Sequence, residues 1–165
     1  MDEEDDQLTK VHIELPHHWA IGGESMWARD LGGDLYQLRN TPFYAYDLNF
    51  GDVVRATADG PDLKPEIRTV VRRSGNRTLR VFFSESLDVQ ARLERLASLV
   101  PMHVSYEGAT KRLYALDLEP EADMAAVRAV LDEWSEQGWA SYETCEARVP
   151  GSFDDAPSGQ GDSRG

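Results

Sequence analysis

Hydrophobic and polar residues alternate in short runs along the first half of the chain, and this period is typical of β-strands. The runs cover residues 11–15, 24–28, 35–38, 43–48, 53–57 and 66–73. Turn-forming residues separate them, and the Gly32-Gly33-Asp34 turn joins the second run to the third as a hairpin. Many short strands at close spacing predict a small, strongly bent β-sheet or an open barrel.

The period changes at about residue 78. After an apolar strand over 78–83, residues 87–100 repeat their apolar positions at helical spacing and stop at Pro101. Strand-like runs over 102–107 and 112–119 follow, then a helical run from Pro120 to Gly138 and a strand over 140–147. This β-α-β-β-α-β order predicts a ferredoxin-like unit, in which two helices cover one face of a four-stranded antiparallel sheet.

The expected fold class is therefore α+β. We predict an all-β half over residues 10–77 and a ferredoxin-like half over residues 78–149, and the pattern leaves open whether the halves are independent domains. Residues 1–9 are strongly acidic, and residues 150–165 are rich in Gly, Ser, Asp and Pro. Both compositions predict disordered tails.

Composition narrows the class of partner. The chain of 165 residues has a net charge of −13, which argues against nucleic acid and anionic membranes and suits a basic protein partner. No apolar run is long enough to span a bilayer, and the acidic N-terminal run is unlike a secretory signal, so we expect a cytoplasmic location. A single cysteine, Cys145, predicts a structural thiol and no cysteine-based metal cluster.

Three segments carry a family likeness: GESMWA with Glu24 and Trp27, LRNTPFYAYDLNFGDVV over 38–54, and VVRRSGNRTLRV over 70–81, together with Tyr36. They resemble a family of small bacterial proteins called domain of unknown function 4265, and the likeness continues more weakly to about residue 147. The resemblance supports the architecture and implies no activity.

Polar and aromatic residues are dense in the all-β half, where a curved sheet would gather them around a pocket. The alternative is that they serve turns and the core. The residues concerned are Glu24, Trp27, Asn40, Tyr44, Tyr46, Asp47 and Asp52.

Five arginines lie close together in a stretch without acids from 67 to 84: Arg68, Arg72, Arg73, Arg77 and Arg80. Arginine binds planar anions with two parallel hydrogen bonds, so Arg73 and Arg80 are candidate anion-binding residues. The alternative is pairing with the protein's own acids. Because Arg80 lies within an apolar strand, we expect it to need a carboxylate partner, which Glu24, Asp47 or Asp52 could provide.

The four histidines match no zinc signature, and we expect no metal and no cofactor. Common phosphate-binding and nucleophile motifs are missing as well. These observations favour a small acidic binding protein that engages a protein or peptide, in an immunity-like or accessory role, rather than an enzyme. The alternative is a small-molecule enzyme or sensor with an anion site between the halves, in which Asp47 or Asp52 is the base. Self-assembly as a homodimer is a third interpretation.

Overall fold

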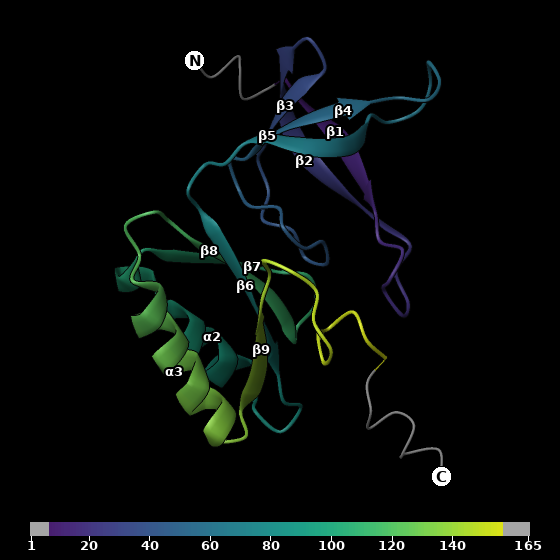
Figure 1. The fold of residues 1–165 in the computed structure, drawn as a ribbon. Coiled ribbons are helices and arrows are strands. Elements are labelled where there is room, and N and C mark those ends of the chain that lie inside the picture. The colour runs from purple at the N-terminus through teal and green to yellow at the C-terminus, as the bar shows by residue number, and fades with distance from the viewer. Residues whose placement is uncertain (1–6, 157–165) are drawn as a thin grey trace.

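Five strands of the N-terminal half form a β-barrel in the computed structural model, which describes residues 7–156 (Figure 1). The strands are β1 (Leu8–Glu14), β2 (Gly23–Gly32), β3 (Leu35–Leu38), β4 (Val53–Thr57) and β5 (Glu66–Arg72). Each pairs antiparallel with the next, and β1 meets β5 in parallel through the His12–Glu66 pair. This last pairing closes the barrel, which the sequence had indicated only as a bent sheet or an open barrel.

Inward-facing side chains of alternate positions fill the barrel, as the period-two pattern predicted. Val11, Met26, Leu38 and Val54 are all buried in this core. The predicted hairpin between β2 and β3 is also present. Gly32, Gly33 and Asp34 have positive φ angles, the left-handed conformation that a tight hairpin turn requires.

The C-terminal half is a four-stranded antiparallel sheet with helices, so the chain has an α+β fold. Its strands are β6 (Arg77–Phe83), β7 (Val104–Gly108), β8 (Leu113–Leu118) and β9 (Ala140–Thr144), in the order β7-β8-β6-β9. Helix α2 (Val89–Ala97) and the 3-10 helix η1 (Val100–Met102) connect β6 to β7, and helix α3 (Met124–Glu136) connects β8 to β9. Figure 1 shows α2 and α3 together on one face of this sheet.

A second core lies between the helices and that face of the sheet. Leu79, Val81 and Phe83 of β6 pack against Leu96 of α2 and Leu131 of α3. Because side chains alternate along a strand, the intervening residues of β6 point to the opposite face of the sheet. That face carries no helix and is turned toward loops of the barrel (Figure 1).

The ends of helix α3 follow the residues that cap them. The helix begins after Asp123, whose carboxylate accepts a hydrogen bond from the Ala126 N–H, and so starts later than the predicted Pro120. Gly138 has a φ of 77° after the last turn, and the Trp139 N–H donates to the Trp134 carbonyl. This is the glycine-terminated helix end that the sequence predicted.

Three predictions made from sequence need correction. Residues 43–48 are not a strand, for a reason given below. Leu8 and Thr9, expected in the acidic tail, belong to β1. Residues 150–156, expected in the disordered C-terminal tail, pack on the sheet, where Phe153 contacts Phe82 with ring centroids 6.2 Å apart. Residues 1–6 and 157–165 lie outside the described part of the chain.

Within residues 7–156, neither α-helix has the length and apolar character needed to cross a membrane.

Candidate functional site

A cleft of about 720 Å³ lies between the two halves, over the sheet face from which Arg80 and Phe82 of β6 point. Its walls come from residues 18–21 and 43–46 of the barrel half and from residues 151–156 near the C-terminal end. Six aromatic side chains line it: Trp19, Phe43, Tyr44, Tyr46, Phe82 and Phe153. The polar residues lining it are His18, Arg80, Ser141, Glu143, Ser152, Asp154 and Asp155.

Arg80 forms the floor of the cleft and is only 1% exposed. Its Nε donates to Glu143 Oε2 at 2.9 Å, and its terminal nitrogens donate to the carbonyls of Pro42, Tyr44 and Ala45. The expected carboxylate partner therefore exists, but it is Glu143 rather than Glu24, Asp47 or Asp52. The two residues face each other across β6 and β9, so strand register determines the pair.

Glu143 is held by the same network. Its second carboxylate oxygen accepts hydrogen bonds from the Tyr46 hydroxyl and, at 2.9 Å, from the Phe153 N–H. Burial raises the pKa of Tyr46, and the hydrogen bond from its hydroxyl to Glu143 raises it further, so the phenol remains a protonated donor. The floor of the cleft is thus hydrogen-bonded internally, with Glu143 accepting from both Arg80 and Tyr46.

Glu24 explains why residues 43–48 form a loop. Its carboxylate points from the inner face of β2 and accepts from the N–H groups of Phe43, Tyr44 and Ala45, at 2.6, 3.1 and 2.9 Å. Arg80 donates hydrogen bonds to carbonyls of the same loop. Side chains therefore satisfy backbone groups that a neighbouring strand would otherwise bond, and the run has no strand partner.

A second network joins Asp47, Asp52 and Arg73 outside the cleft. Asp52 is fully buried and accepts from Arg73 at 3.2 Å and from the Ser74 N–H at 2.9 Å. Arg73 also donates to Asp47 Oδ1 at 2.8 Å. These contacts fix the junction between β5 and β6. They occupy the carboxylates and the guanidinium that the sequence analysis had considered for catalysis and anion binding.

Trp27 and Asn40 form a third, separate group. The Trp27 N–H donates to Asn40 Oδ1 at 2.5 Å, and the indole is 44% exposed with Lys10 Nζ 4.8 Å from the ring centroid. Neither residue lines the cleft. The structure therefore divides the predicted site residues into three groups, of which only Tyr44, Tyr46 and Arg80 line the cleft, while Glu24 supports it from below.

His18 is the main cleft residue that sequence reasoning missed as a site. Its Nδ1 accepts from the N–H groups of Ala20 and Ile21, at 3.0 and 2.9 Å, so the proton of the neutral ring is on Nε2. Its ring also packs edge-on against Tyr44, with centroids 5.4 Å apart. Burial is the largest influence on His18 and lowers its pKa. The negative charge of Asp154 raises the pKa, and the positive charge of Arg80 lowers it.

Arg68, Arg77 and the cysteine have structural surroundings. Arg68 pairs with Asp59, and Arg77 donates to the Ala122 carbonyl. Cys145 is 3% exposed, and burial raises the pKa of its thiol to about 12. A thiol of this kind is unreactive at neutral pH.

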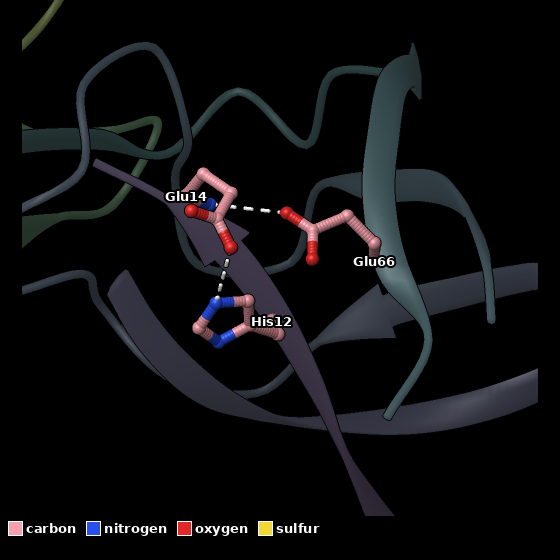
Figure 2. Close-up of side chains that lie close together, drawn as sticks. All are labelled: His12, Glu14 and Glu66. Carbon is pink, nitrogen blue, oxygen red and sulfur yellow. Dashed lines mark hydrogen bonds and ion pairs between the residues drawn. The ribbon is translucent and has the colours of Figure 1, made fainter. Parts of the chain in front are cut away.

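Outside the cleft, three side chains with potential metal-ligand atoms lie close together on the barrel. Figure 2 shows His12, Glu14 and Glu66 converging at the seam between β1 and β5, with one ligand atom of each within 4.8 Å of the others. This is the one such group of three within the described residues.

Comparison with known proteins places this fold among relatives. The model of the family described as "Domain of unknown function (DUF4265)" matches residues 24–142. A crystal structure described as a hypothetical protein from Neisseria gonorrhoeae is similar, with a TM-score of 0.71 at 13% identity, over 84% of this chain and 94% of that chain. At that identity the likeness shows the fold alone. No curated protein gives a significant match.

Proposed function

Since the chain belongs to the family described as "Domain of unknown function (DUF4265)", whose description names no activity, we propose a function from the cleft itself. The protein is a small acidic binding protein that takes a segment of a partner protein or peptide into the aromatic cleft between its halves. The observation that carries this proposal is a cleft of about 720 Å³ with six aromatic walls over a floor whose polar groups bond one another.

The size and lining of the cleft support binding rather than catalysis. Ligand sites usually have volumes of about 300–1,000 Å³, apolar and aromatic walls and a few polar groups. Catalysis needs a nucleophile or base that is free to accept a proton from substrate. Glu143 and Arg80 are bonded to each other, and His18 Nδ1 already accepts two backbone N–H groups.

Charge supports a cationic segment as the ligand. The acids that line the cleft are Glu143, Asp154 and Asp155, and the lining cation, Arg80, is paired with the first of them. Arg148 pairs with the other two, so the three acids exceed the two arginines by one negative charge. Aromatic faces attract lysine and arginine side chains, and the net charge of −13 steers basic partners toward the protein.

The alternative, an anion-binding enzyme or sensor, has less support. It requires Arg80 or Arg73 to offer N–H groups to a ligand. Arg80 donates to Glu143 and three carbonyls, and Arg73 donates to Asp47 and Asp52. A bound anion would have to displace these internal bonds.

Two finer assignments belong to the same proposal. The strand order β7-β8-β6-β9, with the two helices on one face, supports a ferredoxin-like description of the C-terminal half. A cytoplasmic setting for the accessory or immunity-like role rests on the acidic composition and the lone buried cysteine.

Selection from a random peptide library displayed on phage tests the proposal. We expect enriched peptides to combine Lys or Arg with aromatic or large apolar residues. Their affinity should fall at least tenfold in Trp19→Ala, which removes a cleft wall. Trp27→Ala is the matched control, because Trp27 is 44% exposed against 47% for Trp19 and lies outside the cleft.

Three outcomes would count against a peptide-binding cleft. The first is that the library gives no enrichment. The second is that the enriched peptides bind Trp19→Ala as well as they bind the original protein. The third is that light scattering shows a homodimer that Trp19→Ala dissociates, because the cleft is then covered by the second copy. A metabolite that raises the melting temperature and loses this effect in Trp19→Ala would instead favour the small-molecule alternative.

A further inference from the structure

Three potential metal ligands meet on the outside of the barrel, at its seam. His12 and Glu14 lie two residues apart on β1 and share its outer face, and Glu66 of β5 is the backbone partner of His12. His12 Nε2 and Glu14 Oε2 are 3.2 Å apart (Figure 2). The three ligand atoms fall within 4.8 Å of one another, so small side-chain rotations bring all three to one ion.

The neighbouring strand leaves room for the imidazole. Gly23 of β2 pairs with Glu14, and its missing side chain is filled by the ring of His12. A Cβ at position 23 would lie 2.4 Å from His12 Cε1 and 2.6 Å from Nε2. A residue with any side chain here would displace the ring, so Gly23 provides space for His12 to face the two carboxylates.

The carboxylates of this group converge without a cationic side chain between them. Within residues 7–156, the structure records no ion pair of Glu14 or Glu66 with lysine or arginine. Lys64 lies two residues before Glu66, and its ammonium donates to the hydroxyl of Ser25, the cross-strand partner of His12, at 2.8 Å. Glu66 is oriented instead by the Glu14 N–H, which donates to Glu66 Oε2 at 3.1 Å. Two acids held together in this way favour a cation.

We propose that His12, Glu14 and Glu66 bind a first-row divalent metal ion such as Zn²⁺ at the seam of the barrel. One imidazole nitrogen and two carboxylate oxygens are ligands that Zn²⁺ accepts, with water completing its coordination. The ion joins β1 to β5, where a single residue pair closes the barrel. The site is independent of the cleft and of the function proposed for it.

This site departs from the expectation of no metal, which rested on the spacing of histidines. Glu66 lies far from His12 in sequence, and only the parallel pairing of β1 with β5 brings them together. Neither the closure of the barrel nor its register could be obtained from the alternating pattern.

Calorimetric titration of the full chain with Zn²⁺ at neutral pH tests the site. We expect one ion per chain, and affinity at least tenfold lower in His12→Ala and in Glu66→Gln, since each variant removes a ligand. His103→Ala is the matched control. His103 forms a second surface pair with Glu119, at 3.5 Å, but within residues 7–156 no third ligand approaches it.

A further variant separates the geometry of the site from its charge. Gly23→Ala retains all three ligands and the net charge, and Gly23 does not have a positive φ angle. Apart from the His12 ring, the nearest atom to the added Cβ is the Ile13 carbonyl oxygen at 3.3 Å. This Cβ displaces the imidazole, and we expect a loss of Zn²⁺ affinity comparable to that in His12→Ala, with an unchanged circular dichroism spectrum.

The proposal is overturned if His12→Ala or a folded Gly23→Ala binds Zn²⁺ as tightly as the original protein. It is also overturned if several weak sites per chain appear with the same affinities in every variant, because such sites reflect the acidic surface only. A Zn²⁺-dependent rise in melting temperature that His12→Ala abolishes and His103→Ala retains would support it, since a ligand of the folded state stabilises that state.

Discussion

At the base of the cleft, two buried charged side chains form hydrogen bonds with backbone groups that a neighbouring strand would otherwise bond. In the loop over 42–45, Glu24 accepts from three consecutive N–H groups and Arg80 donates to three carbonyls. A hydrogen bond to a charged group is worth more than a neutral one, and a buried backbone group without a partner is costly. These two residues therefore determine the shape of the cleft wall.

Replacing Glu24 tests that role. We expect Glu24→Ala to lower the free energy of unfolding by about 2–4 kcal/mol, because the N–H groups of Phe43, Tyr44 and Ala45 lose their carboxylate acceptor. Urea denaturation measures the change. Glu85→Ala is the control. The Glu85 side chain is 84% exposed, and its Oε2 forms a long ion pair with Arg112 Nη1 at 3.8 Å. Its removal should change stability by less than about 0.5 kcal/mol. A similar small effect in Glu24→Ala would show that the loop is held by other contacts.

His18 gives the cleft a pH dependence. Burial lowers the pKa of this imidazole in the folded protein, so folding favours its neutral form. The corresponding stability is present above the pKa of the unfolded state and is lost as the pH falls through the lower pKa of the folded state. Protonation also removes the Nδ1 acceptor of the Ala20 and Ile21 N–H groups.

We therefore expect the melting temperature to fall between about pH 7 and pH 5 more steeply in the original protein than in His18→Gln. His17→Gln, which alters the exposed neighbouring histidine, should keep the original pH dependence. If His18→Gln and the original protein show parallel curves, the neutral imidazole does not contribute to stability in this range.

At the scale of elements, the sequence predicted what depends on local pattern. The order of strands and helices after residue 78, the β2–β3 hairpin and the glycine-terminated end of α3 all match, because periodicity, turn residues and caps act over a few positions. The run over 43–48 has the alternation of a strand but is a loop, because Glu24 and Arg80 bond its backbone groups. Local pattern could not reveal this, because both residues lie far from the run in sequence. A pocket was expected, and the predicted Tyr44, Tyr46 and Arg80 line the cleft. The lining residues His18, Phe82, Glu143 and Phe153 were missed because they share no local pattern.

The cross-strand pair of Arg80 and Glu143 links β6, β9 and the barrel loop. We expect Arg80→Met and Glu143→Gln each to lower the free energy of unfolding by about 3–5 kcal/mol, since each leaves a buried charge without its partner. The double variant should cost much less than the sum, because both charges are then absent. A double-mutant cycle in urea measures the difference, and additive effects would contradict a coupled pair.

At the scale of the whole molecule, the contacts of the cleft floor cross between the halves. Arg80 and Glu143 belong to the sheet, whereas Tyr46 and the carbonyls of Pro42, Tyr44 and Ala45 belong to the barrel half. The Asp47 N–H also donates to the Cys145 carbonyl at 2.7 Å. Neither half can separate without exposing these groups unpaired.

Unfolding should consequently be a single transition. Trp27 reports on the barrel and Trp134 on the helical core, so versions in which one of these two is the only one left of the chain's four tryptophans follow each half by fluorescence. We expect the two urea curves to coincide. Curves whose midpoints differ would show that the barrel and the sheet unfold as separate domains.

The most direct test of the binding cleft uses the four indole N–H signals of the chain, from Trp19, Trp27, Trp134 and Trp139. A ¹⁵N-labelled sample is titrated with a peptide from the library selection and followed by two-dimensional NMR. We expect the Trp19 signal to shift with the peptide, because Trp19 lines the cleft, and the Trp27 signal to stay in place. A shift of Trp27 with an unchanged Trp19 would place the ligand on the outer face of the barrel and contradict the proposed site.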